Sequence, residues 1–426
     1  MHRHLRWYIA VLIGIGTIIN YFDRANMSVA TDPMSKQFGL SLSQMGIVLS
    51  AFSWSYTLIQ IPIGALLDRI GVKWLTRVGT ILWTIATVIT AVAGGLGLVI
   101  LSRILLGVAE APVFPGNSKA TGYWFPVRER GLATASFDAA AKFSNVIGVP
   151  LIAWAITVWG WRGGFWLTAV LSVLFAIAYW IWYRDPKEKK SLSREEYDYI
   201  VAGGAQTGEA EGQIWANLGF ALKQRKIWGL GIGFAAYNYS FYLFLTWLPG
   251  YLEKQMHMTV LKSGWYTVMP WLIATITDVF VGGWLVDTLI KQGRDPTRVR
   301  KTVLVIGMLL GLAVIGAAFT QNPNWAVVWI SISLGGLAFA ATICWSIPSL
   351  IAPRGTVGSV GSVMNFLGNI SGIIAPIVTG FIADATGQFS VAFAVAAAVL
   401  VVGIISFVFL LGTIEPIRTS QRQPLP

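Results

Sequence analysis

The segment Gly64-Ala65-Leu66-Leu67-Asp68-Arg69-Ile70-Gly71-Val72-Lys73 closes a long apolar run, and a shorter copy, Gly283-Trp284-Leu285-Val286-Asp287, closes another in the second half of the chain. Glycine lets two helices approach closely, aspartate accepts hydrogen bonds from the start of a neighbouring helix, and the basic residues mark an interface with water. Because the pattern repeats, the two halves of the chain are predicted to be related copies. We assign conformational gating to Gly64, Asp68, Arg69 and Asp287.

The composition around these motifs is that of a membrane protein. Of the 426 residues, 55% are hydrophobic and only 12% are charged, and the mean hydropathy is +0.65, whereas soluble domains carry about 25% charged residues. The hydrophilic stretch 184–225 is predicted to link two six-helix bundles, 1–183 and 226–426, and its segment Ser193 to Glu196 fits a capping box that starts a short surface helix. Apolar runs of about 20 residues predict an all-α fold with twelve transmembrane helices near residues 7–30, 44–66, 76–95, 98–119, 131–157, 162–183, 226–251, 260–288, 303–320, 325–351, 356–382 and 388–412.

Lysine and arginine are unevenly distributed between the predicted loops. With a cytoplasmic N-terminus, most of the 31 Lys and Arg residues fall on the cytoplasmic side, as the positive-inside rule requires. We therefore expect a multi-pass membrane protein with both termini in the cytoplasm. The net charge of +12 follows from this orientation and from contact with anionic lipid, so no nucleic-acid partner is expected.

Two pairs of ionisable residues lie within predicted transmembrane helices: Asp23 and Arg24 in the first, and Arg103 and Glu110 in the fourth. Each such residue costs roughly 2.5 to 3.5 kcal/mol on insertion scales, so it is rarely kept without a partner, a wet cavity or a function. Arg103 and Glu110 are about two helical turns apart and therefore share a face. Together the four residues predict a polar pathway through the middle of the membrane.

Several motifs carry a family resemblance. They are Tyr21 to Asn26, Tyr56, Arg103 through Pro112, and Tyr123 to Pro126 with the pair Glu129-Arg130. With the twelve spans, the central loop and the motif at 64–73, the chain resembles the major facilitator superfamily over essentially its whole length. The motifs resemble the anion:cation symporter branch in particular, and the chain is most similar there to bacterial proton symporters of D-galactonate and other sugar acids.

This resemblance implies roles for the four charged residues. Asp23 and Glu110 are expected to bind the coupling proton, and Arg24 to bind the substrate carboxylate, which suits the planar fork of a guanidinium. We expect protonation of Glu110 to free Arg103 or to reshape the cavity around the anion. The alternative is a static set of ion pairs that pins the first and fourth helices together.

Lys142 departs from the pattern of galactonate carriers, which have a neutral polar residue at this position. Asp138 lies four residues earlier, so one interpretation is a self-contained ion pair on the fifth helix. The other is that Lys142 adds a second cation to the cavity, which favours a dianionic substrate or an aromatic acid over a monocarboxylate.

Neutral polar and aromatic residues complete the predicted substrate site. They can offer hydrogen bonds and flat apolar faces to a polyol. The resemblance supports Trp345 among them, whereas Asp278 is assigned either a structural pair or a role in the cavity. The candidates are Tyr56 and Asn117 in the first half and Tyr237, Asn238, Tyr242, Trp345, Ser346, Asn365 and Asn369 in the second.

Signals for enzymatic chemistry are missing from the sequence. There is no phosphate-binding P-loop, and His2, His4, His257 and the single Cys344 show no metal-ligand spacing. We therefore expect a monomeric secondary transporter, not an enzyme, with the proton as coupling ion and no other cofactor, which imports a small organic anion such as an aldonate, aldarate or uronate by alternating access. The alternatives are a carrier or exporter of aromatic or other carboxylates, and a ligand sensor built on a transporter fold.

Overall fold

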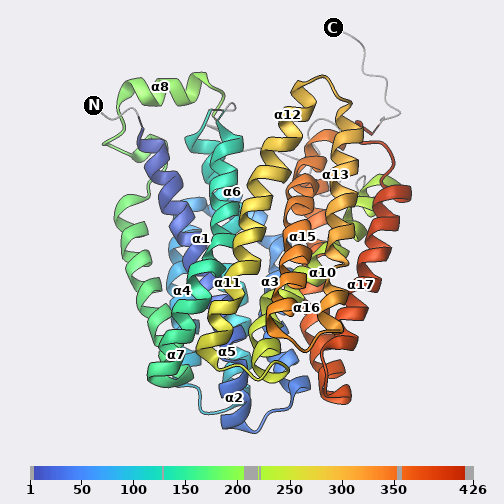
Figure 1. Cartoon of the computed structure of the whole chain (residues 1–426). Coiled ribbons are helices and arrows are strands. Elements are labelled where there is room, and N and C mark those ends of the chain that lie inside the picture. Colours follow the sequence, from blue (N-terminus) through green and yellow to red (C-terminus); the bar gives the residue numbers. More distant parts are fainter. Residues whose placement is uncertain (1–3, 127–128, 206–218, 220–221, 353–356, 418–426) are drawn as a thin grey trace. The chain divides into compact units, whose positions relative to one another are not determined.

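The computed structural model describes residues 4–126, 129–205, 219, 222–352 and 357–417, and all their regular secondary structure is helical (Figure 1). Each of the twelve predicted spans coincides with a helical segment. Nine stretches of these residues are long and apolar enough to cross a membrane, and one of them contains two predicted spans. Helices α3 (Leu42–Ile70) and α10 (Arg225–Lys254) are not among the nine.

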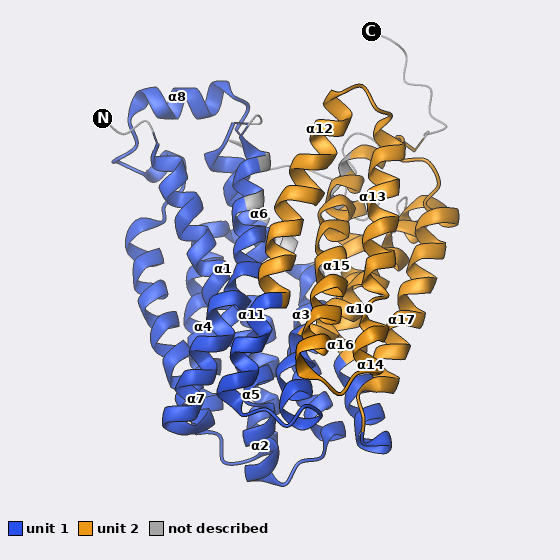
Figure 2. Ribbon diagram, in the orientation of Figure 1, with its two compact units in different colours: residues 1–210, 245–269, 376–387 blue, residues 211–244, 270–375, 388–426 orange. Residues whose placement is uncertain are grey.

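Two compact units divide the chain (Figure 2). Unit 1 contains residues 1–210, 245–269 and 376–387, and unit 2 contains 211–244, 270–375 and 388–426. The change from unit 1 to unit 2 at residue 210 lies inside the predicted linker. However, the segments 245–269 and 376–387, which were predicted in the second bundle, cluster with unit 1.

Unit 1 is built mainly from the first half of the chain, and two breaks interrupt its helices. Helix α5 ends at Glu110 and α6 begins at Val113, with Pro112 between them. Gly160 has a φ of 72° inside α7, a left-handed conformation that glycine adopts without steric cost, so two helices are joined there. The helices are α1 (Leu5–Val29), α2 (Thr31–Phe38), α3, α4 (Val72–Val92), α5 (Leu96–Glu110), α6 (Val113–Trp124), α7 (Arg130–Trp182) and α8 (Arg194–Ala202).

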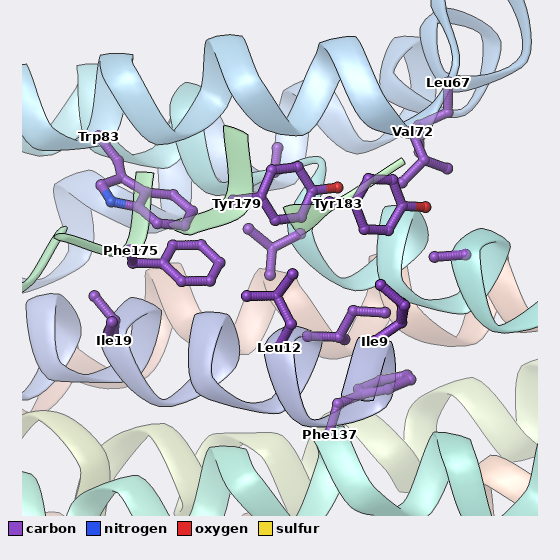
Figure 3. Packing of buried hydrophobic residues seen from close by; sticks show 14 of the residues in the cluster. Ile9, Leu12, Ile19, Leu67, Val72, Trp83, Phe137, Phe175, Tyr179 and Tyr183 are labelled. Carbon is purple, nitrogen blue, oxygen red and sulfur yellow. The ribbon is translucent and has the colours of Figure 1, made fainter. Parts of the chain in front are cut away.

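An aromatic core holds α1, α4 and α7 together (Figure 3). The rings of Trp83 and Phe175 are stacked with centroids 5.8 Å apart, and those of Tyr179 and Tyr183 are 4.6 Å apart. Phe175 packs directly on α1, because a Cβ added to Gly16 would lie 2.4 Å from its ring. Large rings therefore fill the space between α1 and the second half of α7.

The surface helix α8 is anchored to the start of α1. Ser193 accepts a hydrogen bond from the Glu196 backbone amide at 3.2 Å, as half of a capping box does. The Glu196 side chain does not close the box; it pairs with Arg6 at 2.9 Å. Arg6 also pairs with Glu129 at 2.7 Å, and Tyr199 of α8 donates to the same glutamate.

At the end of unit 1 that carries α2, segments from both halves of the chain pack together. Lys254 pairs with Asp32 of α2 at 2.6 Å, and Ser28 donates to the Thr246 carbonyl oxygen at 2.7 Å. A Cβ added to Gly46 would lie 2.6 Å from the Pro376 carbonyl oxygen. These contacts explain why 245–269 and 376–387 belong to unit 1.

Unit 2 is also helical throughout its described residues, with α15 packed against α13, α14 and the π-helical segment η2. Apart from part of α10, its elements are α11 from residue 270 on (α11 spans Val260–Thr277), η2 (Asp278–Leu285), α12 (Val286–Lys291), α13 (Pro296–Gly311), α14 (Val314–Ala318), α15 (Pro323–Ile351), α16 (Val357–Thr386) up to residue 375, α17 (Ser390–Ile405) and η3 (Ser406–Leu410).

The close helix packing expected at the repeated motif is found only in part. A Cβ on Gly283 would meet nothing within 4 Å, whereas one on Gly282 would lie 2.8 Å from the Thr342 side chain. The expected close approach at Gly283 is therefore wrong by one residue, because the π-helix around it shifts the helical register. Arg69 and Asp287 are exposed, while the surroundings of Gly64 and of the Asp68 side chain, both in α3, lie outside the described part.

Candidate functional site

A buried ion pair joins α1 to α5. Arg24 donates from Nε to Oε2 of Glu110 at 3.0 Å, and the side chains are only 6% and 0% exposed. Both residues are therefore shielded from the surface of the protein. Glu110 is the last residue of α5, where the helix gives way to Pro112.

Three aromatic rings surround the guanidinium of Arg24. Its central carbon lies 4.8 Å from the ring centroid of Tyr21, 4.6 Å from that of Phe52 and 4.9 Å from that of Tyr56. Such cation–π contacts are worth more when the cation is desolvated, as it is here. The predicted residue Tyr56 is thus next to Arg24, and Phe52 and Tyr21 are site residues that sequence reasoning missed.

A close contact between α3 and α5 brings these rings to the charge. Ser55 donates to the Ile104 carbonyl oxygen at 2.7 Å. A Cβ added to Gly107 would lie 2.3 Å from the Phe52 carbonyl oxygen, so only glycine fits without displacing α3. A glycine three residues before the buried Glu110 could have predicted that another helix packs closely here.

Asp23, although adjacent to Arg24 in sequence, has different neighbours. Its carboxylate accepts hydrogen bonds from Thr87 of α4 at 3.1 Å and from Ser172 of α7 at 3.4 Å, and it is 1% exposed. Successive residues of a helix point about 100° apart, which separates the two charges. Asp23 is therefore held by hydroxyl groups.

Arg103 of α5 is the second buried arginine of this region. Its Nη1 donates to the Asp23 backbone oxygen at 3.4 Å, and its guanidinium carbon lies 5.3 Å from the Phe52 ring. The carboxylate of Glu110 is bonded to Arg24 instead. Phe52 consequently lies against both guanidinium groups.

Several buried polar atoms of this region make no hydrogen bond with any described residue. They are both side-chain polar atoms of Asn20, Oε1 of Glu110 and Nε of Arg103. Asn20 was not predicted as a site residue, although an asparagine one turn before Arg24 in an apolar helix was a signal for it.

The remaining first-half candidates lie on α6 and α7. Asn117 donates to the Thr17 hydroxyl of α1 at 3.1 Å. Lys142 pairs with Asp138 at 2.9 Å, which confirms the predicted pair one turn apart. The Lys142 side chain is 8% exposed and that of Asp138 is 32% exposed, so the carboxylate is the more accessible partner.

The second-half candidates form a cluster within unit 2. Tyr242 donates to Asn369 at 3.0 Å, and Asn369 donates to Asn365 at 3.2 Å. The rings of Tyr237 and Trp345 lie 5.5 and 5.4 Å from that of Phe234.

Three further candidates of unit 2 make hydrogen bonds within that unit. Asn238 and Ser346 donate to carbonyl oxygens of their own helices. Asp278 accepts a hydrogen bond from the Thr342 hydroxyl, a partner that the sequence did not reveal.

The two clusters differ in chemistry. Unit 1 combines carboxylates, guanidinium groups and aromatic rings, whereas the substrate-site candidates of unit 2 are neutral apart from Asp278. Within the described residues, no three His, Cys, Asp or Glu side chains converge in a way that could hold a metal ion. The unit 1 cluster can bind an anion and exchange protons.

Comparison with known proteins adds family and substrate information. The family model of the Major Facilitator Superfamily matches residues 13–376. The chain is 44% identical over 420 residues to the uncharacterized transporter YybO of Bacillus subtilis, covering 97% of this chain and 96% of the relative. It is 33% identical to the D-galactonate transporter of Escherichia coli, covering 96% of each chain.

Two further similarities concern substrate and fold. The chain is 32% identical to the probable galactarate/D-glucarate transporter GudP of B. subtilis, covering 99% of this chain and 95% of the relative. The crystal structure of a D-xylose-proton symporter superimposes with a TM-score of 0.74 at 15% identity, covering 97% of this chain and 99% of that one.

Proposed function

The chain belongs to the major facilitator superfamily and has the all-helical fold of its transporters, and from this premise we propose that it is a proton-coupled symporter that imports a sugar acid by alternating access. Relatives named as transporters of D-galactonate and of galactarate or D-glucarate support this substrate class. The protein is a multi-pass membrane transporter. We place it in the bacterial inner membrane as a monomer with both termini in the cytoplasm.

The buried pair of Arg24 and Glu110 is the observation that carries the proposal. While Glu110 is ionised, the two charges balance each other at 3.0 Å. Protonation of Glu110 leaves the Arg24 cation in a dry site, where an uncompensated charge costs several kcal/mol. A substrate carboxylate restores the balance, so proton binding favours anion binding.

Asp23 serves in this mechanism as a second proton site. Its carboxylate is buried and bonded to the hydroxyls of Thr87 and Ser172. Arg103 lies beside the Asp23 backbone and Phe52, where it stabilises the anionic state of the cluster. Titration of the two acids would then be linked through the charges of the two arginines.

Substrate hydroxyls and a second carboxylate require further groups. We assign hydrogen bonding to Tyr56 and Asn117 in unit 1 and to the polar and aromatic cluster of unit 2. Lys142 supplies a second cation for a dianion when Asp138 is displaced. We also propose that conformational gating depends on Gly64, Asp68, Arg69 and Asp287.

An uptake panel tests the function. Liposomes that contain the purified protein are loaded with D-galactonate, galactarate, galacturonate or benzoate for counterflow. Uptake of the same compounds driven by a proton gradient is measured in empty liposomes. We expect sugar acids to be exchanged and accumulated. Transport of benzoate alone would identify an aromatic-acid carrier, and binding with uptake at background would identify a sensor.

The role of Lys142 is tested by selectivity. Lys142→Ala should lower galactarate uptake more than D-galactonate uptake, because only the dianion needs the second cation. Asp138→Asn is the matched control, since it removes the other member of the same pair and leaves the cation in place. Equal effects of Lys142→Ala on both substrates would restrict this pair to a structural role.

A further inference from the structure

Asn20 is fully buried in α1, yet neither polar atom of its amide bonds to a described residue. Leaving such a group unsatisfied costs about 1–3 kcal/mol. Buried polar groups are bonded to protein or to ordered water in nearly all high-resolution structures. Asn20 therefore points to a bound partner.

The position of Asn20 on α1 directs it toward the charged cluster. Residues three and four apart lie on the same side of a helix, so Asn20 shares a side with Asp23 and Arg24. One turn before it, Gly16 contacts the Phe175 ring, and this ring is stacked on Trp83 of α4 (Figure 3). The stretch of α1 that contains Asn20 therefore borders Trp83.

Trp83 and Glu110 carry matching unsatisfied atoms. Nε1 of Trp83 and Oε1 of Glu110 are buried and make no hydrogen bond with a described residue. Helices α4 and α5 touch one turn from Trp83, because a Cβ on Gly79 would lie 2.8 Å from the carbonyl oxygen of Ala109, the residue before Glu110.

The three side chains form a complementary set. The Asn20 amide nitrogen and the Trp83 indole are donors, whereas the Asn20 amide oxygen and Glu110 Oε1 are acceptors. A water molecule accepts two hydrogen bonds and donates two. It can accept from Trp83, donate to the Asn20 amide oxygen and to Glu110 Oε1, and keep one lone pair for a second water on the solvent side, to which the Asn20 amide nitrogen donates.

We propose that Asn20 is a positioning residue of the proton site, which with Trp83 holds an ordered water at Oε1 of Glu110. This inference rests on the proposed coupling role of Glu110. The water gives one proton to Oε1 and takes one from the solvent side, so it stays neutral while Glu110 loses its charge. Arg24 is then available to the anion.

The test compares Asn20→Leu, which keeps the approximate volume but not the polar atoms, with the wild type in the same liposomes. We expect proton-driven accumulation of D-galactonate or galactarate to slow at least about tenfold, because positioned proton transfer contributes factors of this size or more. Counterflow, which needs no net proton transfer, should stay within about threefold. Asn20→Ser, which keeps a donor and an acceptor, should recover part of the loss.

Two controls separate positioning from folding. Asn145→Leu removes another buried asparagine of unit 1, one that donates to the Ala141 carbonyl oxygen of its own helix at 3.3 Å, and it should not lower accumulation selectively. Trp83→Phe removes the indole N–H with little change in shape and should slow accumulation in the same direction as Asn20→Leu. It also replaces Asn20→Leu if that variant does not fold.

An infrared difference spectrum gives an independent readout. The band of the protonated Glu110 carboxyl, assigned by its loss in Glu110→Gln, should shift in Asn20→Leu or Trp83→Phe because its hydrogen-bond partner is lost. An unshifted band, or an equal loss of accumulation and counterflow, would overturn the proposal. Absence of proton-driven uptake by the wild type would instead overturn the proposed function.

Discussion

Replacing Glu110 by glutamine removes the negative charge beside Arg24 and nearly preserves the side-chain shape. The variant mimics the protonated acid permanently, so it cannot carry a proton through the transport cycle. We expect it to lose proton-driven accumulation and to retain counterflow. We also expect tighter anion binding, because the substrate no longer competes with a resident carboxylate for Arg24.

The size of the affinity gain follows from the geometry. Nε of Arg24 lies 3.0 Å from Oε2 of Glu110, so a carboxylate on the opposite edge of the guanidinium would lie about 6 Å from that oxygen. Two like charges at about 6 Å repel by about 3 kcal/mol at an effective dielectric constant of about 20. Removal of this repulsion predicts tighter binding by up to about 100-fold.

Titration calorimetry with galactarate at neutral pH measures this change, and liposomes with and without a proton gradient measure transport. Glu253→Gln is the matched control, because Glu253 is also buried in unit 1 and is bonded to Ser263 at 2.7 Å. It should leave the affinity within about threefold of the wild type. Accumulation by Glu110→Gln at the wild-type level would exclude Glu110 from coupling, and an unchanged affinity would refute the electrostatic reasoning.

Three other predictions concern single contacts. Arg24→Lys should weaken anion binding by about 10- to 100-fold in calorimetry, since an ammonium loses the paired hydrogen bonds of the guanidinium; unchanged binding would assign the carboxylate to another residue. Gly107→Ala should destabilise the protein by about 1–3 kcal/mol in thermal unfolding, because its Cβ would lie 2.3 Å from the Phe52 carbonyl oxygen; a stability equal to that of the wild type would contradict the tight contact. The hydrogen bond from Arg6 lowers the pKa of Glu129 in the folded protein. The ionised carboxylate therefore stabilises the fold fully above the unfolded pKa of about 4.3, and this stabilisation is lost as the pH falls through the lowered pKa of the folded state. The difference in melting temperature between the wild type and Glu129→Gln should therefore shrink in acid, and a constant difference would exclude this ionisation.

The sequence predicted the positions of the helices and the buried charges well. Long apolar runs and isolated charges are properties of one segment, and so are the break between the spans 131–157 and 162–183 and the pair of Lys142 with Asp138. Each of these can be inferred without knowing the neighbouring helices.

Pairings between helices could not be predicted in the same way. The spacing of Arg103 and Glu110 shows that they share a face, but it does not show that Arg24 of another helix reaches Glu110 first. Tyr21 and Phe52 look like ordinary membrane-helix residues in the sequence. Their role beside Arg24 follows only from the packing of α3 near α1.

Register caused the remaining error. The close contact lies at Gly282 and not at Gly283, in a π-helical segment whose register differs from that of an α-helix. Hydropathy does not report such a shift, because both residues are glycines in an apolar run.

At the α2 end of unit 1, glycines pack so tightly that an added methyl group could favour an alternative conformation. A methyl group on Gly380 would lie 2.5 Å from the Leu42 carbonyl oxygen, in a contact that must separate if this end opens. Overpacking costs about 1–3 kcal/mol, which corresponds to a change of about 5- to 150-fold in a two-state population ratio. Gly380→Ala should thus enrich the conformer open at this end without ligand or antibody, and make it accessible to structure determination.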